Sequence, residues 1–214
     1  MNTNRIMAIV AHPDDEVLGC GGTLARLAHE GHQVHVVYVT GGETSSGHKR
    51  LGESGAACEI LGLEAPIHLG FDDQQLATGY HIELNEVIRD KVQELGPNII
   101  YTHAREDLNS DHRRVHEAVM VACRPTRDCP VTELYTFCVS SWDFGEFGNF
   151  QANTYVNINP YMNTKQKAMT VYSTEVQGAP HPMAIDNIKY ENLVNGSRFC
   201  LWEVEQFKQV FRLL

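Results

Sequence analysis

Three groups of polar residues in this sequence combine side chains that can bind a metal ion or transfer a proton. The first is the run His12-Pro13-Asp14-Asp15-Glu16, and the second is Gly41-Gly42-Glu43-Thr44. The third begins at His103 and continues with Asp107-Leu108-Asn109-Ser110-Asp111-His112. Imidazole nitrogens and carboxylate oxygens are both zinc ligands, and histidine also transfers protons near neutral pH. Because the chain has 11 histidines in 214 residues, metal-dependent or acid–base chemistry is the first hypothesis.

The first group has a spacing that suits a metal site. His12 and Asp15, three residues apart across a turn into a helix, can present a nitrogen and an oxygen to one ion. A catalytic zinc typically has three protein ligands and one open position. A histidine of the third group would complete that count, and Asp14 would then act as general base toward a water molecule. The same acidic run also suits a helix start, so capping is the alternative interpretation.

The third group contains two histidines one helical turn apart. Either both His112 and His116 bind the ion, or only His112 does so from the start of the helix. The short loop after His103 favours His112, because it places residues 107–112 nearest the end of the preceding strand. His103 itself either acts directly at the site or supports it through a hydrogen bond.

Alternating strand and helix patterns surround these groups. Short β-branched or apolar runs predict strands, and apolar residues at three- and four-residue spacing predict helices. The predicted strands are 6–11, 34–40, 66–71, 98–102, 131–139 and 155–158. The predicted helices are 16–29, 49–61, 82–95, 112–123 and stretches around 161–172, 183–194 and 203–213.

Strands that alternate with helices of about 12–15 residues indicate βαβ units. We therefore predict an α/β fold of the doubly wound type, with a mostly parallel, Rossmann-like sheet, helices on both faces and a C-terminal extension of strands and helices. No repeat or linker divides the chain, so we predict one domain over residues 1–214. In such a sheet ligands bind beyond the carboxyl ends of the strands, which is where the three groups lie.

The composition excludes several classes of protein. Hydrophobic residues make up 43% and charged residues 21% of the chain, which is typical of a globular protein. The net charge of −10, without a basic run, argues against a nucleic-acid partner. No run approaches the roughly 20 apolar residues that cross a bilayer, and a signal-peptide pattern is lacking, so we expect no stable membrane insertion and a cytoplasmic location. The oligomeric state stays open, homo-oligomers included.

The run Ala11–Glu16 after the first predicted strand resembles the signature of the LmbE-like family of zinc-dependent de-N-acetylases. That family includes the N-acetylglucosaminyl-phosphatidylinositol (PIG-L) deacetylases. Asp111-His112 at the start of a predicted helix matches the Asp-His pair of the family. Further matches are Thr40-Gly41-Gly42-Glu43, Arg50 with Glu53, and Pro180-His181-Pro182, so the resemblance runs from residue 6 to about residue 182.

The resemblance implies a metal-dependent amidohydrolase with a small-molecule substrate. The expected reaction is removal of an N-acyl group, most simply N-acetyl, from an amino sugar or amino-sugar conjugate. The roles that it implies are zinc binding by His12, Asp15 and His112, general-base catalysis by Asp14 and substrate contact by Arg50. Asp111 is expected to orient a ligand histidine.

At one position the sequence departs from the family pattern. Many members have a histidine that stabilises the oxyanion and protonates the leaving amine where this chain has Asn109. An amide can donate a hydrogen bond to an oxyanion but cannot supply a proton at neutral pH. The proton must then come from His181, from His103 or from Asp14 after it has taken up the proton of the water. The Pro-His-Pro loop favours His181, which leaves His103 to join Arg50 as a substrate-binding candidate.

Other readings of the same residues stay open or are excluded by specific features. A nucleotide-binding oxidoreductase needs a Gly-x-Gly-x-x-Gly turn after the first strand, where this chain has its His-Pro-Asp-Asp run. A non-catalytic sugar-binding protein on the same scaffold stays open because of Asn109. Fe²⁺ suits two histidines and a carboxylate as well as Zn²⁺ does. The aromatic loop Ser140–Gln151 either packs internally or contacts a sugar face.

Overall fold

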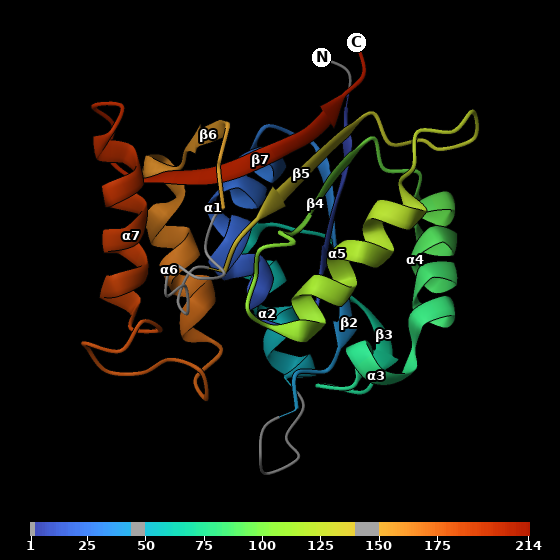
Figure 1. The fold of residues 1–214 in the computed structure, drawn as a ribbon. Coiled ribbons are helices and arrows are strands. Elements are labelled where there is room, and N and C mark those ends of the chain that lie inside the picture. The colour runs from blue at the N-terminus through green and yellow to red at the C-terminus, as the bar shows by residue number, and fades with distance from the viewer. Residues whose placement is uncertain (1–2, 44–49, 140–149) are drawn as a thin grey trace.

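The computed structural model describes residues 3–43, 50–139 and 150–214 (Figure 1). The aromatic loop Ser140–Gln151 therefore lies almost wholly outside the described residues. Within the described ranges, no helix has the length and apolar character needed to span a membrane. The strands are β1 (Arg5–Val10), β2 (Gln33–Thr40), β3 (Ile67–Phe71), β4 (Ile99–His103), β5 (Glu133–Phe137), β6 (Thr154–Asn157) and β7 (Val204–Arg212). The helices are α1 (Asp15–His29), α2 (Leu51–Leu61), α3 (Leu76–Gly79), α4 (His81–Leu95), α5 (Ser110–Ala122), η2 (Asn159–Tyr161), α6 (Met162–Thr170) and α7 (Ile185–Ser197).

The seven strands form one sheet in the order β3-β2-β1-β4-β5-β7-β6. The first five strands of that order are parallel, and β7 is antiparallel to both β5 and β6. The chain winds outward from β1 in one direction through β2 and β3, and in the other through β4 and β5. The strand order thus reverses between β1 and β4, which is the switch point where doubly wound folds bind their ligands. The predicted α/β class is confirmed.

Both faces of the sheet are buried, because successive residues of a strand point to opposite faces. On one face, Met7 of β1 packs with Leu84 of α4 and Val115 of α5. On the other face, Ile6 packs with Leu24 of α1. A further layer is added where α6 packs on α1 and α2. Figure 1 shows α4 and α5 together on one side of the sheet and α1, α6 and α7 on the other.

The C-terminal extension differs from the prediction in one element. The helix predicted around 203–213 is wrong, because Val204–Arg212 form strand β7. Apolar residues at 204, 207, 210 and 211 fit helical spacing. The segment instead forms main-chain hydrogen bonds with the otherwise open edge of β5. Phe207 then lies fully buried against Tyr101 and Tyr135 of the neighbouring strands. The edge strand predicted at 155–158 is confirmed as β6.

A buried ion pair joins this extension to α1. Lys165 Nζ of α6 lies 2.7 Å from Glu205 Oε1 of β7, and both side chains are almost fully buried. The Glu205 carboxylate also accepts hydrogen bonds from the backbone N–H groups of Gly22 and Thr23, at 2.9 and 2.7 Å. Lys165 donates to the carbonyl of Leu18 at 2.9 Å. Both charges are thus compensated, and the helix that begins at the site is anchored along its length to β7 and α6.

Candidate active site

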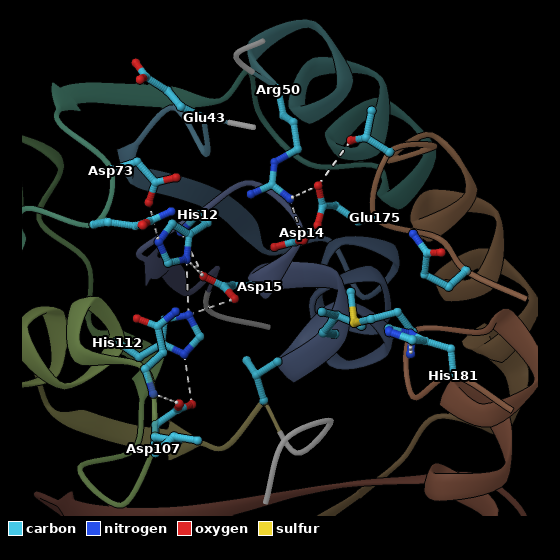
Figure 2. Close-up of a pocket in the computed structure, with 18 residues that line it drawn as sticks. His12, Asp14, Asp15, Glu43, Arg50, Asp73, Asp107, His112, Glu175 and His181 are labelled. Atoms are coloured by element: carbon cyan, nitrogen blue, oxygen red, sulfur yellow. Dashed lines mark hydrogen bonds and ion pairs between the residues drawn. The ribbon is translucent and has the colours of Figure 1, made fainter. Parts of the chain in front are cut away.

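The first and third polar groups meet at the switch point of the sheet. β1 and β4 are adjacent parallel strands, so the loops that follow them leave the sheet side by side. His12 and Asp15 lie on the turn between β1 and α1, and His112 lies in the first turn of α5 (Figure 2). These side chains are buried, at 3–7% exposure, below a cavity of about 860 Å³.

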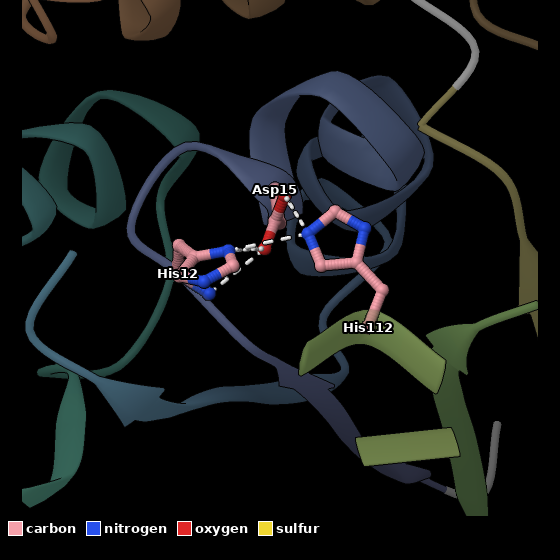
Figure 3. Close-up of side chains that lie close together, drawn as sticks. All are labelled: His12, Asp15 and His112. Atoms are coloured by element: carbon pink, nitrogen blue, oxygen red, sulfur yellow. Dashed lines mark hydrogen bonds and ion pairs between the residues drawn. The ribbon is translucent and has the colours of Figure 1, made fainter. Parts of the chain in front are cut away.

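His12, Asp15 and His112 form one compact cluster (Figure 3). His12 Nδ1 lies 3.2 Å from His112 Nε2 and 3.2 Å from Asp15 Oδ2. Asp15 Oδ1 lies 3.2 Å from His112 Nε2. Two imidazole nitrogens and one carboxylate, contributed by segments about 100 residues apart, thus surround one point.

The outward nitrogens of both histidines are held by carboxylates. His112 Nδ1 lies 2.9 Å from Asp107 Oδ2, and His12 Nε2 lies 3.0 Å from Asp73 Oδ1 and 3.5 Å from Asp111 Oδ2. In the neutral rings, an outward N–H donated to these carboxylates leaves an inward lone pair that a cation can bind. Asp15 also faces both inward nitrogens, so the cluster requires positive charge at this point, either as protons on the rings or as a metal ion. The donor set therefore fits zinc or another divalent metal, with an open position toward the cavity.

The pKa values of the cluster follow from the same excess of negative charge. Burial lowers the pKa of His12, but contacts with Asp111, Asp15 and Asp73 outweigh it and raise the pKa well above the usual value. Burial likewise opposes charge on His112, yet Asp15 and Asp107 raise its pKa to about 9. These surroundings attract positive charge, as a cation site must.

The two remaining histidines of the third group do not join the cluster. His103 is fully buried beneath His112, whose ring stacks on it at 4.0 Å, and its Nε2 accepts a hydrogen bond from the backbone N–H of Ala11 at 2.9 Å. Burial lowers the pKa of His103 to about 4, so the ring is neutral. It does not line the cavity, so the structure does not bring it to a substrate. His116 donates to the carbonyl of His103 at 2.9 Å and belongs to none of the groups of described residues that could hold one ion together, so the geometry favours the alternative in which only His112 binds the ion.

Asp14 stands at the start of α1 without capping it. Its side chain makes no cap hydrogen bond, contrary to the capping alternative, and its φ of 120° is a conformation that costs a non-glycine residue about 1–3 kcal/mol. The buried Glu16 carboxylate accepts from the Asp14 backbone N–H at 3.0 Å and from the Tyr172 hydroxyl at 2.7 Å. Burial raises the pKa of Glu16 to about 7. A residue far along the chain thus helps to hold this strained turn.

The Asp14 carboxylate faces Arg50. Arg50 Nη1 lies 2.8 Å from Asp14 Oδ2 and 3.0 Å from Glu175 Oε1, and Gly42 leaves room for the guanidinium, which would clash with a side chain there. Burial raises the pKa of Asp14 well above its usual value, although Arg50 acts in the opposite direction. Arg50 does line the cavity, as the substrate-contact prediction requires, but it is already paired with two carboxylates.

Two other predicted residues line the cavity at its edges. Asn109 caps α5, because its side-chain oxygen accepts from the backbone N–H of Asp111 at 2.8 Å, and this leaves the amide N–H₂ as its available donor. His181 lines the cavity on the opposite side (Figure 2), and its Nδ1 accepts from the backbone N–H of Met183 at 3.1 Å. Asp111 Oδ2 lies 3.5 Å from Nε2 of His12, one of the predicted ligands, and it also accepts from the backbone N–H of Gln74 at 2.7 Å.

Three carboxylates that shape this site had no predicted role. Asp107 holds His112, Asp73 faces His12, and Glu175 pairs with Arg50. Asp73 follows strand β3, so the strand-end rule that selected the other groups could also have selected it. Glu175 follows α6, where no comparable rule applies.

The sequence of this chain is similar to those of known deacetylases. The family model described as GlcNAc-PI de-N-acetylase (PIG-L) matches residues 7–123. The uncharacterized deacetylase YaiS of Escherichia coli K12 is 40% identical over 129 residues, which cover 56% of this chain and 68% of that protein. A 1D-myo-inositol 2-acetamido-2-deoxy-alpha-D-glucopyranoside deacetylase of Mycobacteroides abscessus is 39% identical over 87 residues, or 33% of this chain, and the match spans only 31% of that protein's length.

Solved structures share the whole fold. The conserved protein TT1542 from Thermus thermophilus superposes with a TM-score of 0.83 at 25% identity, covering 99% of this chain and 97% of that one. An N,N'-diacetylchitobiose deacetylase from Pyrococcus horikoshii gives a TM-score of 0.79 at 18% identity, covering 98% and 84%. The likeness extends beyond residue 123, where the family model ends. By its match to that model and its alignment with YaiS, the chain belongs to the GlcNAc-PI de-N-acetylase (PIG-L) family.

Proposed function

We propose that this protein is a zinc-dependent hydrolase that removes an N-acyl group, most simply N-acetyl, from an amino sugar or an amino-sugar conjugate. The observation that carries the proposal is the cluster of His12, Asp15 and His112, whose possible ligand atoms lie close together at the wall of the cavity beside Asp14. The deacetylase names of its relatives support the reaction type. Fe²⁺ is the alternative metal, because the same donor set suits both ions.

His12, Asp15 and His112 would hold the metal. When bound there, zinc supplies Lewis-acid chemistry that lowers the pKa of a water molecule and polarises the amide carbonyl. The carboxylates of Asp107, Asp73 and Asp111 behind the two histidines keep both rings in the tautomer and orientation that a ligand needs.

Asp14 acts as the general base. It lies next to the ligand Asp15 but turns its carboxylate toward Arg50, so it stays outside the ligand set. The raised pKa that burial gives Asp14 makes its carboxylate a stronger proton acceptor than an exposed one. Arg50 fixes the position of that carboxylate through the 2.8 Å contact, and we assign it this positioning role together with substrate contact.

Asn109 and His181 act on the other side of the scissile bond. The amide N–H₂ of Asn109 donates to the oxyanion that develops on the acyl group. His181 donates the proton that lets the amine leave, because His181 lines the cavity, whereas His103 does not line it and, when neutral, is too weak an acid. If His181 does not act, the proton returns from Asp14.

The test combines metal analysis with release of primary amine from a panel of N-acetyl sugars. Metal-loaded protein should release the amine, and His112→Ala should lose both bound metal and turnover. His116→Ala is the matched control, since His116 lies one turn along the same helix and bonds only to a backbone carbonyl. Full activity in His112→Ala would refute the proposal, and tight sugar binding without turnover in the wild type would identify a binding protein instead.

His181 has its own test. His181→Ala should lower kcat about 10²-fold or more while the metal content stays unchanged, because a general acid contributes on that scale. Unchanged turnover would assign the proton donor to Asp14.

A further inference from the structure

The charges that line the cavity are unequal in number. Among the described residues, six carboxylates line it and one guanidinium does, that of Arg50. A bound divalent metal and a protonated His181 would still leave carboxylates in excess by two. The carboxylates are those of Asp14, Asp15, Glu43, Asp73, Asp107 and Glu175.

The guanidinium already has two carboxylates on one of its nitrogens. Arg50 Nη1 contacts Asp14 at 2.8 Å and Glu175 at 3.0 Å, and its side chain is only 8% exposed. Figure 2 shows the side chain of Arg50 directed toward these two carboxylates. An anionic substrate group that approached the guanidinium would therefore also approach two carboxylates.

Glu175 is one of the partly exposed carboxylates that a substrate can meet from solvent. Its side chain is 30% exposed, against 9% for that of Asp14. It sits on a turn whose backbone bonds run from Glu175 and Val176 to the carbonyl of Tyr172. Because the Tyr172 hydroxyl is bonded to buried Glu16 at 2.7 Å, this turn is fixed and Glu175 is held over Arg50.

We propose that this cavity selects amino sugars that carry no anionic group on the acetamido sugar, and that Glu175 is a determinant of that selection. The proposal rests on the proposed function for its substrate class. Uncharged sugars and sugars that carry a further amine enter the acidic cavity without repulsion, whereas a phosphate or sulfate ester is repelled. In GlcNAc-PI, after which the family is named, the phosphate lies outside the acetamido sugar. The family name therefore does not show whether this cavity accepts an anionic group on that sugar.

The experiment compares kcat/KM for N-acetylglucosamine with kcat/KM for its 6-sulfate and its 6-phosphate. The sulfate ester serves as an anion that chelates metal weakly. At low salt the wild type should favour the uncharged sugar at least about tenfold over either ester, and the preference should shrink as salt screens the carboxylates.

Two variants locate the effect. Glu175→Gln should raise the ratio of kcat/KM for the sulfate to that for the uncharged sugar about fivefold, the scale of one charge at close range in a partly hydrated site. Glu30→Gln removes the same charge from an exposed pair with Arg26 at the far end of α1, and it should leave the ratio unchanged. Equal or better hydrolysis of the esters by the wild type, or equal ratios in the two variants, would overturn the proposal.

A binding measurement distinguishes failure of the charge selection from failure of the proposed function. If no N-acetyl sugar is hydrolysed, the proposed function fails, and thermal-shift titration then compares glucosamine with glucosamine 6-phosphate. Tighter binding of glucosamine would sustain the charge selection. Equal binding, tighter binding of the phosphate or no binding of either compound would overturn it.

Discussion

The parallel part of the sheet and its antiparallel extension contribute different things to the same cavity. The parallel part, β1 to β5, carries at its strand ends the residues that could bind a metal and activate water: His12, Asp14, Asp15 and His112. The extension contributes Glu175 and His181 at the cavity edge and Glu205 beneath α1. The residues proposed to bind the metal and activate water thus lie in the parallel part, where the order of the strands brings their side chains together. The extension borders the cavity and stabilises the parallel part. This division predicts that damage to the two regions will have separable signatures.

The largest expected effect tests the parallel part. Asp14→Asn should lower kcat about 10²- to 10⁴-fold, because the amide cannot accept the proton of a water molecule. Metal content should stay close to that of the wild type, since Asp14 is not in the ligand cluster, whereas the melting temperature should fall, because the change removes one charge of the buried pair with Arg50. Amine release, metal analysis and a melting curve on one preparation check all three. Activity within about tenfold of the wild type would remove Asp14 from the mechanism and weaken the comparison.

The next effect tests the extension. Lys165→Met removes one partner of the buried pair with Glu205 and should lower the free energy of unfolding by about 3–5 kcal/mol. Lys91→Met is the matched control, because Lys91 and Glu94 form a surface pair at the same 2.7 Å distance, which is worth about 0–1 kcal/mol. Denaturant unfolding measures both. Equal destabilisation by the two variants would mean that the extension does not brace α1 through this pair.

A smaller effect concerns the carboxylate behind His112. Asp107→Asn should weaken metal binding about 10- to 100-fold, because Asp107 fixes the proton on the outward nitrogen of that ring. Asp72→Asn serves as control, since Asp72 is bonded to the Tyr80 hydroxyl instead. Competition with a chelator measures the metal affinity. Unchanged affinity in Asp107→Asn would contradict the inferred orientation of the histidine.

The same division explains how much could be predicted from the sequence. His12, Asp15 and His112 were predicted as one site because parallel strands end at one edge of a sheet, and the structure brings them together. That rule depends only on the order of strands and helices. Glu175 was missed because its position depends on a turn held by Tyr172, a tertiary contact without a local signal.

Strand β7 was mistaken for a helix for a related reason. Its apolar spacing is ambiguous, and the partner that decides its conformation, β5, lies about 70 residues away. Asp73 is a different case, since it follows a predicted strand and was accessible to the rule that found the others. The metal cluster was therefore more predictable than the cavity edge at Glu175. Local sequence patterns specify the cluster, whereas packing between distant segments specifies the edge.

The hydrogen bond from Tyr172 to Glu16 has a consequence for the exchange of segments between relatives. The family model ends at residue 123, which suggests that the remainder could be replaced as a module to change substrate preference. Yet the turn that carries Asp14 is braced from residue 172, and α1 is braced from residues 165 and 205. A chimaera joined after α5 would keep every catalytic side chain of the N-terminal part. It would be active only if the incoming segment supplied a hydroxyl in place of that of Tyr172 and an ion pair in place of Lys165–Glu205. Residues that do not contact substrate therefore limit which segments can be exchanged at this boundary.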